Sequence, residues 1–366
     1  MQYLKLRNKF NNSLYYLTKK ILFHYEPEKV HNNFIKIGKS LGSHKVSKEA
    51  ASKLFSFENP ALKQNLVGIT FRNPVGLSAG FDKNAELVDL LPSIGFGFAE
   101  VGSITANPCK GNEGKRLVRL PEKKSIWVNL GLNNKGYLEI KNRIKSKKFE
   151  IPIGISVAKT NSAETVNPKI GLKDYLTTLK GMKKIGSYFT INISCPNAFG
   201  GQPFSSPELF KSLMNEIQKL KIKKPIFIKL SPDLGGKNIE SILKISLKYD
   251  LSGFVCSNLT KKGKIKSGGF SGKEVEKKAN LLLSKVYKFK IKNKKSWILI
   301  GSGGIFSAED AYKKIKLGAN LVQLITGMIY KGPALIGQIN QGLVDLLKRD
   351  GYSNIREAVG KEHEKR

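Results

Sequence analysis

The chain has 366 residues, of which 40% are hydrophobic, and its formal net charge at pH 7 is +36. This length suits either one large α/β barrel with an extension or two ordinary domains. No run of about 20 apolar residues is present, so we expect no transmembrane helix. The Lys-rich N-terminus lacks the apolar core and the small-residue cleavage site of a signal peptide.

The three cysteines, Cys109, Cys195 and Cys256, are odd in number and scattered along the chain. This pattern argues against a disulfide framework or a zinc site, and for a reducing compartment. The four histidines lie near the two ends of the chain, outside its glycine-rich body. We therefore expect no metal site and no Ser–His–Asp triad.

The large positive charge raises two classes of partner, nucleic acid and anionic membrane. The excess is mostly lysine, with only eight arginines, and it is spread along the chain. Specific recognition of phosphates or bases usually shows arginine clusters with interleaved aromatic residues. We therefore favour a solvated lysine-rich surface and expect no nucleic acid partner.

Residues 1–50 predict two short amphipathic helices. Apolar side chains recur there at roughly helical spacing: Leu14, Leu17, Ile21 and Leu22, then Val30, Phe34, Ile37 and Leu41. Pro27 is well placed to start the second helix, and Gly42 can end it. Exposed apolar faces with many lysines suit a membrane surface, and packing against the main body is the equally open alternative.

From residue 73 onward, short β-branched runs alternate with amphipathic stretches. The expected strands cover residues 74–80, 98–103, 152–157, 188–194, 225–230, 253–257, 297–301 and 320–325. Helices are expected over residues 84–94, 207–220, 237–249, 307–317 and 333–348. Eight alternating units predict a (β/α)₈ TIM barrel. The expected organisation is a helical extension over residues 1–50 and a barrel domain over residues 51–366.

A polar loop follows the expected fourth strand, at residues 192–197 (NISCPN). Barrels place their chemistry at the C-terminal ends of their strands, and Pro196 cannot continue a strand. The strand therefore delivers Asn192, Cys195 and Asn197 to an open site, where two carboxamides can hold a planar substrate and a thiol can move a proton or attack. The alternative is an ordinary strand exit with a buried cysteine.

Two glycine-containing loops follow the seventh and eighth strands, at residues 301–304 (GSGG) and 326–327. Barrels commonly bind a phosphate between these loops. Lys229 ends the fifth strand, and if it points inward it needs an anionic partner, such as a reduced flavin ring; otherwise its head reaches solvent. No dinucleotide fingerprint follows the first strand, so a nicotinamide site is not indicated.

Together these segments resemble the dihydroorotate dehydrogenase family. From about residue 26 to the C-terminus, the resemblance rests on residues 73–84 (NPVGLSAGFDKN), 96–103 (FGFAEVGS), 192–197 (NISCPN), 229–233 (KLSPD), 268–272 (GGFSG), 301–304 (GSGG) and 331–333 (KGP). The N-terminal helices, the pair Asn133-Asn134 and residues 350–360 (DGYSNIREAVG) look like the membrane-associated, quinone-using class. That class carries FMN and oxidises dihydroorotate to orotate in pyrimidine synthesis, passing the electrons to a membrane quinone.

The resemblance also implies roles for individual residues. Flavin binding is implied for Ala79, Gly80, Lys83, Ser103, Ser156, Asn192, Lys229, Ser257, Gly272, Gly304, Ile325 and Thr326. Substrate binding is implied for Lys83, Asn129, Asn192, Asn197 and Asn258. Cys195 occupies the position of the catalytic base. We expect a peripheral enzyme on the cytoplasmic side of a membrane, with no obligate protein partner.

Three features depart from the pattern of the quinone-using class. Cys195 stands where that class has serine and the soluble class has cysteine, the loop 127–134 is one residue shorter, and residues 199–204 lack the usual leucine-arginine pair. A soluble electron acceptor such as fumarate is therefore the main alternative. A tRNA-modifying flavin barrel, of the dihydrouridine type, and a non-catalytic scaffold are the others.

Overall fold

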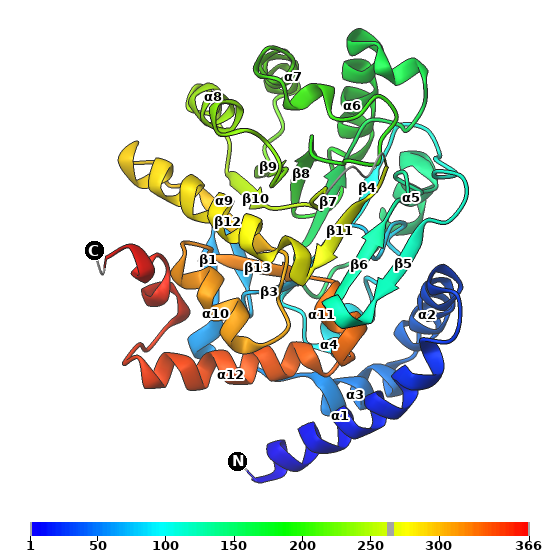
Figure 1. The fold of residues 1–366 in the computed structure, drawn as a ribbon, viewed down its shortest axis with the longest axis vertical. Coiled ribbons are helices and arrows are strands. Elements are labelled where there is room, and N and C mark those ends of the chain that lie inside the picture. The colour runs from blue at the N-terminus through cyan, green and yellow to red at the C-terminus, as the bar shows by residue number, and fades with distance from the viewer. Residues whose placement is uncertain (1, 262–266, 365–366) are drawn as a thin grey trace.

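The computed structural model describes residues 2–261 and 267–364, which form a closed eight-stranded parallel barrel with helices around it (Figure 1). The strands follow the order β10-β12-β13-β3-β4-β7-β8-β9 around the barrel. Their bounds are β3 (Val75–Leu77), β4 (Phe98–Ile104), β7 (Ile153–Val157), β8 (Tyr188–Asn192), β9 (Ile226–Leu230), β10 (Gly253–Cys256), β12 (Ile298–Ser302) and β13 (Leu321–Leu324). The predicted TIM barrel and its eight strands are confirmed.

Helices follow the strands around the outside of the barrel. Their bounds are α5 (Gly136–Ile144), α6 (Pro168–Met182), α7 (Pro207–Lys219), α8 (Gly236–Ser246), α9 (Lys273–Lys292), α10 (Ala308–Lys316), α11 (Thr326–Lys331) and α12 (Leu335–Arg349). Four of the five predicted helices are confirmed as α7, α8, α10 and α12. Their apolar stripes pack on the barrel, as their amphipathic patterns indicate.

The helix predicted over residues 84–94 is wrong, because only α4 (Leu91–Ile94) forms there. The buried Asp82 carboxylate accepts hydrogen bonds of 2.8 Å from the backbone N–H groups of Glu86 and Leu87. Ala85 has a positive φ of 55°, which no helix continues. The apolar residues of this segment are buried as their pattern indicates, but they belong to a compact turn and not to a helix.

The N-terminal end of the barrel is closed by an antiparallel hairpin that was not predicted from the sequence. It consists of β1 (Gln64–Leu66) and β2 (Ile69–Phe71). Phe71 packs with Phe98, Tyr188 and Phe227, which come from three barrel strands. Because alternate residues of a strand share a face, the polar residues two positions further along these strands lie nearer the opposite, C-terminal end.

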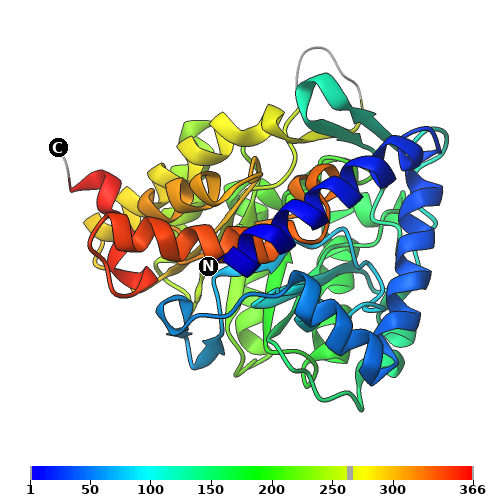
Figure 2. The ribbon, with the colours of Figure 1, turned by 90° about the horizontal axis from the view of Figure 1, so that it is seen from below.

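The N-terminal extension contains three helices, rather than the two predicted: α1 (Gln2–Leu22), α2 (Pro27–Gly42) and α3 (Lys45–Phe55). The second helix starts at Pro27 and ends at Gly42, as predicted, and the boundary expected at residue 50 falls inside α3. Figure 2 shows α1 running obliquely across the molecule, with α2 turning away from its end. In the described part of the chain, no helix has the length and apolar character needed to cross a bilayer.

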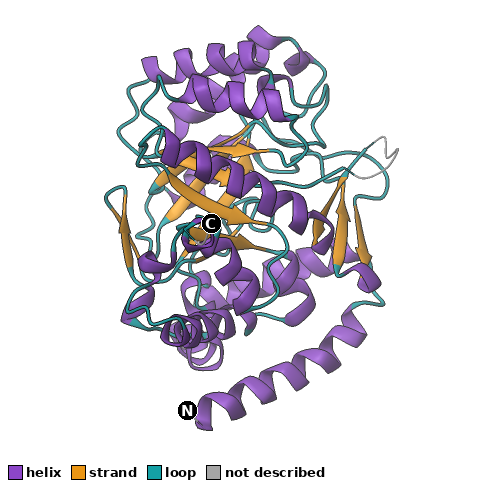
Figure 3. Cartoon of the chain, turned by 60° about the vertical axis from the view of Figure 1, so that its left-hand side comes forward, coloured by secondary structure: helices purple, strands orange, loops and turns teal. Residues whose placement is uncertain are grey.

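A second sheet of three antiparallel strands stands apart from the barrel strands in Figure 3. It is built from β5 (Leu117–Leu120), β6 (Ser125–Val128) and β11 (Gly269–Gly272), with β6 in the middle. It joins the extension to the barrel, because Arg116 pairs with Glu28 of α2 and Arg119 donates to the Tyr25 carbonyl. This sheet was not predicted from the sequence.

Candidate functional site

A cavity of about 510 Å³ begins at the C-terminal ends of the barrel strands and continues between the N-terminal helices. Its wall at the barrel includes Ala79, Gly80, Lys83, Ser103, Asn192, Cys195, Asn197, Lys229, Asn258, Ile325 and Thr326. Its wall at the helices includes Tyr15, Phe23, Val30, His31, Phe34, Ile37 and Leu41, with Arg119 from β5. One space therefore connects a polar barrel mouth to an apolar region, which we call the helical gallery.

A smaller cavity of about 90 Å³ adjoins the first, and Lys229 and Thr326 line both. Its wall includes Ser257, Gly272, Gly303, Gly304 and Gly327, from the ends of β10, β11, β12 and β13. Gly272 and Gly304 have positive φ angles of 82° and 79°, and a Cβ on Gly304 would lie 2.4 Å from the Glu276 side chain. Glycine is therefore required where these two segments turn.

The barrel mouth holds a connected set of buried polar side chains around Asn192. Its Nδ2 donates to Ser103 Oγ at 2.9 Å, and Ser103 Oγ lies 2.8 Å from Ser156 Oγ. The Asn192 Oδ1 accepts from Ser194 Oγ at 2.9 Å, and Asn258 Nδ2 donates to that same hydroxyl at 2.9 Å. This network holds both Nδ2 and Oδ1 of the Asn192 carboxamide in place. It also connects Ser156 to the site, although Ser156 does not line the cavity.

Asn197 lines the cavity and carries one side-chain atom without a hydrogen-bond partner. Its Nδ2 donates to the Val128 carbonyl at 3.0 Å, while its Oδ1 is buried without a hydrogen-bond partner. Asn129 is not part of the cavity wall. Instead, its Oδ1 accepts from Asn112 Nδ2 at 2.8 Å, and Asn112 also donates to the Asn197 carbonyl at 3.1 Å. The structure thus gathers Asn192, Asn197 and Asn258, and places Asn129 one side chain behind them.

Lys229 points inward at the end of β9, with 4% of its surface exposed. Its Nζ makes one long hydrogen bond, 3.4 Å to Ser78 Oγ. Among the described residues, no carboxylate lies within ion-pairing distance of this ammonium. Burial lowers the pKa of Lys229, and the buried Glu100 opposes that shift. A buried cation with unused donors therefore faces the junction of the two cavities, where an anionic ligand would be stabilised.

Cys195 is a free thiol that reaches both the large cavity and a small one of about 10 Å³. Burial raises its pKa above the ordinary value. The backbone N–H groups of Asn197 and Ala198, with the charges of Lys229 and Lys159, act in the opposite direction. The thiolate is therefore disfavoured by desolvation and favoured by four nearby positive or partly positive groups.

Lys83 projects into the cavity between the barrel mouth and the helical gallery. Its Nζ lies 3.2 Å from His31 Nε2 of α2, and burial lowers the Lys83 pKa to about 8. Burial and the Lys83 charge together lower the His31 pKa to about 3. At neutral pH the pair therefore consists of a charged ammonium and a neutral imidazole.

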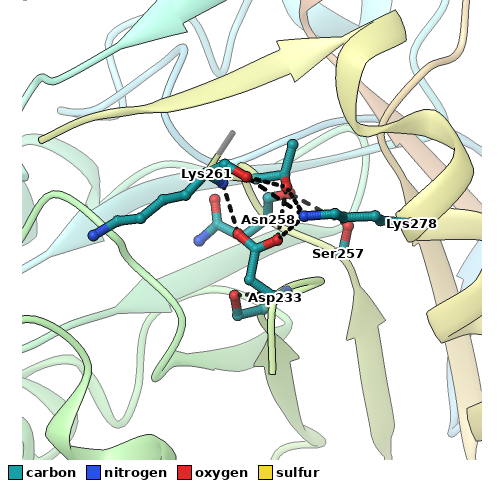
Figure 4. Close-up of polar contacts among 7 residues, drawn as sticks. Asp233, Ser257, Asn258, Lys261 and Lys278 are labelled. Carbon is teal, nitrogen blue, oxygen red and sulfur yellow. Dashed lines mark hydrogen bonds and ion pairs between the residues drawn. The ribbon is translucent and has the colours of Figure 1, made fainter. Parts of the chain in front are cut away.

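Behind the wall, Asp233 fixes the segment that carries Ser257 and Asn258 (Figure 4). Its carboxylate accepts from Thr260 Oγ1 and from the Lys261 backbone N–H, each at 2.7 Å, and Lys278 pairs with it at 2.6 Å. The Lys261 side chain extends away from this cluster in Figure 4, so its contribution comes from the backbone. The cluster holds the exit of β10 in place.

Comparison with known proteins identifies the family. The family model described as dihydroorotate dehydrogenase matches residues 61–347. The chain belongs to the dihydroorotate dehydrogenase family. A dihydroorotate dehydrogenase (quinone) of Haloarcula marismortui is 35% identical over 354 residues, which cover 94% of this chain and 98% of that protein. One from Sulfurovum sp. is 37% identical over 359 residues, covering 94% of this chain and 98% of that protein.

Solved structures agree with this family assignment. The crystal structure of the dihydroorotate dehydrogenase of Eimeria tenella in complex with ferulenol superposes with a TM-score of 0.82 at 27% identity. The match covers 92% of this chain and 96% of that one. It therefore includes the N-terminal helices in part, as well as the barrel.

Dihydroorotate dehydrogenases are flavin-dependent, and the donor set of this site fits a flavin. The buried Lys229 ammonium lacks an anionic partner, and the glycine-lined small cavity next to it offers backbone N–H groups suited to a phosphate. In the described residues, no group of three or more His, Cys, Asp or Glu side chains is placed to hold a metal ion.

Several residues that line or support these cavities were not among the predicted site residues: Tyr15, His31, Asn112, Arg119, Lys159 and Asp233. One sequence signal was available for His31, which is a polar residue on the apolar face of α2, next to Val30 and one turn before Phe34. Lys159 and Asp233 had a signal as well, because each follows an expected strand, where barrels place their chemistry. Tyr15, Asn112 and Arg119 had none, because their partners lie far away in the sequence.

Proposed function

We propose that this chain is a quinone-dependent dihydroorotate dehydrogenase, which uses FMN to oxidise dihydroorotate to orotate in pyrimidine synthesis. The observation that carries the proposal is the single cavity that joins the barrel mouth to the helical gallery. A polar end suits a charged pyrimidine, and an apolar end between exposed helices suits a lipid-soluble acceptor.

Lys83 and the asparagines are proposed to bind the substrate. The Lys83 ammonium would pair with the carboxylate of dihydroorotate. Asn197 Oδ1, buried without a partner, would accept from a ring N–H. Asn258 and Asn192 would complete the amide contacts, while Asn129 would act through Asn112 and the Asn197 backbone. A pyrimidine analogue without the matching N–H would leave Asn197 Oδ1 unpaired, which is a strong basis for rejection.

Cys195 is proposed to be the base. Its thiolate would take the proton from C5 of dihydroorotate, while the hydride leaves from C6. FMN, when bound, supplies the acceptor for that hydride. A positioned base of this kind is worth about 10²–10⁴ in rate.

FMN is proposed to bind across the two cavities. Gly272, Gly304 and Thr326 would hold the phosphate in the smaller cavity. Ala79, Gly80, Ser103, Asn192, Lys229, Ser257 and Ile325 would surround the remainder, with Ser156 acting through Ser103 and Lys83 at the margin. Lys229 would supply the positive charge for a reduced flavin.

The helical gallery is proposed to admit the quinone. Its wall is mostly aromatic and aliphatic, and its polar groups include His31, Arg119 and the hydroxyl of Tyr15. Arg119 and His31 could donate to a quinone carbonyl, whereas the Tyr15 hydroxyl already donates to the Ile329 carbonyl at 2.7 Å. A dianion such as fumarate would lose hydration against the apolar wall. The gallery therefore favours a quinone even though Cys195 is the residue found in the soluble class.

The surface of α1 is proposed to rest on the cytoplasmic face of a membrane. Six apolar residues of this helix are each more than half exposed and recur at three- and four-residue steps: Tyr3, Leu6, Phe10, Leu14, Leu17 and Ile21. Lysines on the same helix would meet anionic lipid headgroups. Docking in this way would bring the outer end of the gallery to the lipid.

An anaerobic two-step experiment tests the proposal. Dihydroorotate should bleach the flavin of the purified protein, and a short-chain quinone should restore its colour. Recolouring by fumarate but not by quinone would contradict the assigned acceptor. An absence of bleaching would contradict the assigned substrate.

A further inference from the structure

The segment that follows β7 contains a buried lysine that lines neither of the two larger cavities. Lys159 has 3% of its surface exposed. Its Nζ donates to the Phe199 carbonyl at 2.9 Å and to Thr165 Oγ1 at 3.1 Å. Among the described residues, no carboxylate lies within ion-pairing distance of this ammonium. Since burying an unpaired charge is unfavourable, its placement needs an explanation.

The hydrogen bonds of Lys159 hold the loop that begins at Cys195. Lys159 binds the carbonyl of Phe199, and the neighbouring Asn161 Oδ1 accepts from the N–H of the same residue. Asn112 donates to the Asn197 carbonyl at 3.1 Å. Both backbone groups of Phe199 are thus fixed by one short segment, and the path of the chain leaving the thiol is fixed with them.

Lys159 also lies close enough to act on the thiol electrostatically. Cys195 and Lys159 line the same cavity of about 10 Å³. The other titratable groups around the pair are Lys229 from β9, Tyr175 and Asp174 from α6, and Cys109. Asp174 directs its carboxylate to Thr160, accepting from the backbone N–H at 2.8 Å and from Oγ1 at 2.5 Å. The Lys159 charge is therefore only partly compensated.

We propose that Lys159 is a positioning residue for the base, which holds the Cys195 loop and supplies positive charge that favours the thiolate. In the reaction, the C5–H bond of the substrate breaks and an S–H bond forms on Cys195, while Lys159 keeps its proton. Lys229 differs in role, because it lines both of the larger cavities. Lys159 lines the small cavity that it shares with Cys195. This inference rests on the proposed function of Cys195.

Alkylation of Cys195 as a function of pH tests the proposal without relying on turnover. The holoenzyme is treated with iodoacetamide in the absence of substrate, and the Cys195 peptide is quantified by mass spectrometry. Only the thiolate reacts, so the midpoint of the rate profile reports its formation. Lys159→Met and Lys159→Gln should move the midpoint up by about one pH unit, the shift expected when a nearby charge is removed. Lys159→Arg should restore the wild-type midpoint.

The glutamine variant separates charge from tethering, because it keeps a donor for the Phe199 carbonyl and loses the charge. A wild-type midpoint in Lys159→Gln would overturn the electrostatic part of the proposal, and a wild-type midpoint in Lys159→Met would overturn it entirely. Lys183→Met is the matched control, since Lys183 also donates to a carbonyl, that of Leu220 at 2.8 Å, but follows α6 at the opposite end of the barrel. It should leave the midpoint unchanged.

One further variant keeps the proposal testable if the Lys159 variants do not fold. Asp174→Asn keeps an acceptor for Thr160 and removes the carboxylate that opposes Lys159, so it should lower the midpoint; a rise or no change would contradict the proposal. In variants that fold, the rate of flavin reduction by dihydroorotate should fall about tenfold at acidic pH and recover at high pH. A shifted alkylation midpoint in a protein that dihydroorotate does not bleach would support Lys159 and refute the proposed substrate.

Discussion

The two ends of the large cavity are built on different principles. The barrel mouth is formed by residues at the ends of strands, and its polar groups hold one another, as in the chain from Asn258 through Ser194 to Asn192. The helical gallery is formed by side chains from α1, α2 and β5, and apolar groups make up most of its wall. The first end can select a molecule by its hydrogen-bonding pattern, and the second can select one by its affinity for an apolar environment.

The contrast extends to how the two ends are held in place. The residues of the barrel mouth are held by the closed sheet, in which Asn192 of β8 is paired in register with Lys229 of β9. The gallery is held by individual side-chain contacts, which include the Glu28–Arg116 ion pair, the Tyr15–Ile329 hydrogen bond and the contact of His31 with Lys83. The two half-reactions should therefore respond to different substitutions.

The largest effect is expected at the barrel mouth. Cys195→Ala should slow flavin reduction by dihydroorotate about 10²–10⁴-fold, because the base is lost, while orotate still binds. Cys195→Ser should retain part of the rate, since a hydroxyl can serve with assistance. Rapid-mixing absorbance measures the rates, and an unchanged rate in the alanine variant would remove Cys195 from the mechanism.

The next largest effect is expected in the gallery. Arg119→Ala should slow reoxidation of the reduced enzyme by quinone about 10- to 100-fold, because a hydrogen bond from a charged donor is lost. Flavin reduction should keep its wild-type rate. Arg356→Ala, an exposed arginine of the C-terminal region, is the control. A loss of flavin reduction in Arg119→Ala would contradict the separation of the two ends.

Lys83 lies between the two ends of the cavity, and loss of its proton should weaken substrate binding at high pH. Its pKa of about 8 means that the ammonium is present below pH 8 and is lost as the pH rises above that value. The KM for dihydroorotate should therefore stay constant up to about pH 8 and then rise about tenfold per pH unit. Lys83→Met should bind weakly at every pH, and a wild-type KM that is constant to pH 10 would contradict the assigned role.

The smallest effect is expected at the lipid surface. Phe10→Glu should weaken binding to anionic vesicles about fivefold, since roughly 1 kcal/mol of apolar burial is lost, while leaving turnover of a water-soluble quinone unchanged. Leu281→Glu alters an equally exposed apolar residue on α9 and serves as the control. Co-sedimentation with vesicles measures the binding, and equal loss in both variants would contradict a specific membrane-facing helix.

The sequence was most informative where the structural signal is local. Each barrel strand carries its own β-branched run and its own polar exit, so Asn192, Cys195 and Lys229 could be placed at the barrel mouth before the structure was known. The helix predicted over residues 84–94 failed because apolar periodicity does not reveal the Asp82 carboxylate that caps a turn there.

Long-range pairing is what the sequence could not supply. The sheet of β5, β6 and β11 joins residues from opposite halves of the chain, and it carries Arg119 to the gallery. The sequence also showed no sign that Asn112 Nδ2 donates to Asn129 Oδ1, which keeps Asn129 out of the cavity wall. Strand-end position places Lys159 and Cys195 at the same end of the barrel, but it does not reveal the hydrogen bond from Lys159 to the Phe199 carbonyl.

The most direct test of the two-ended site measures both half-reactions separately in Cys195→Ala and Arg119→Ala. We predict a reciprocal pattern, in which Cys195→Ala loses reduction by dihydroorotate but is reoxidised by quinone normally after chemical reduction, and Arg119→Ala shows the reverse. If both variants lose the same half-reaction, or each loses both, the barrel mouth and the gallery are not separate sites on one cavity.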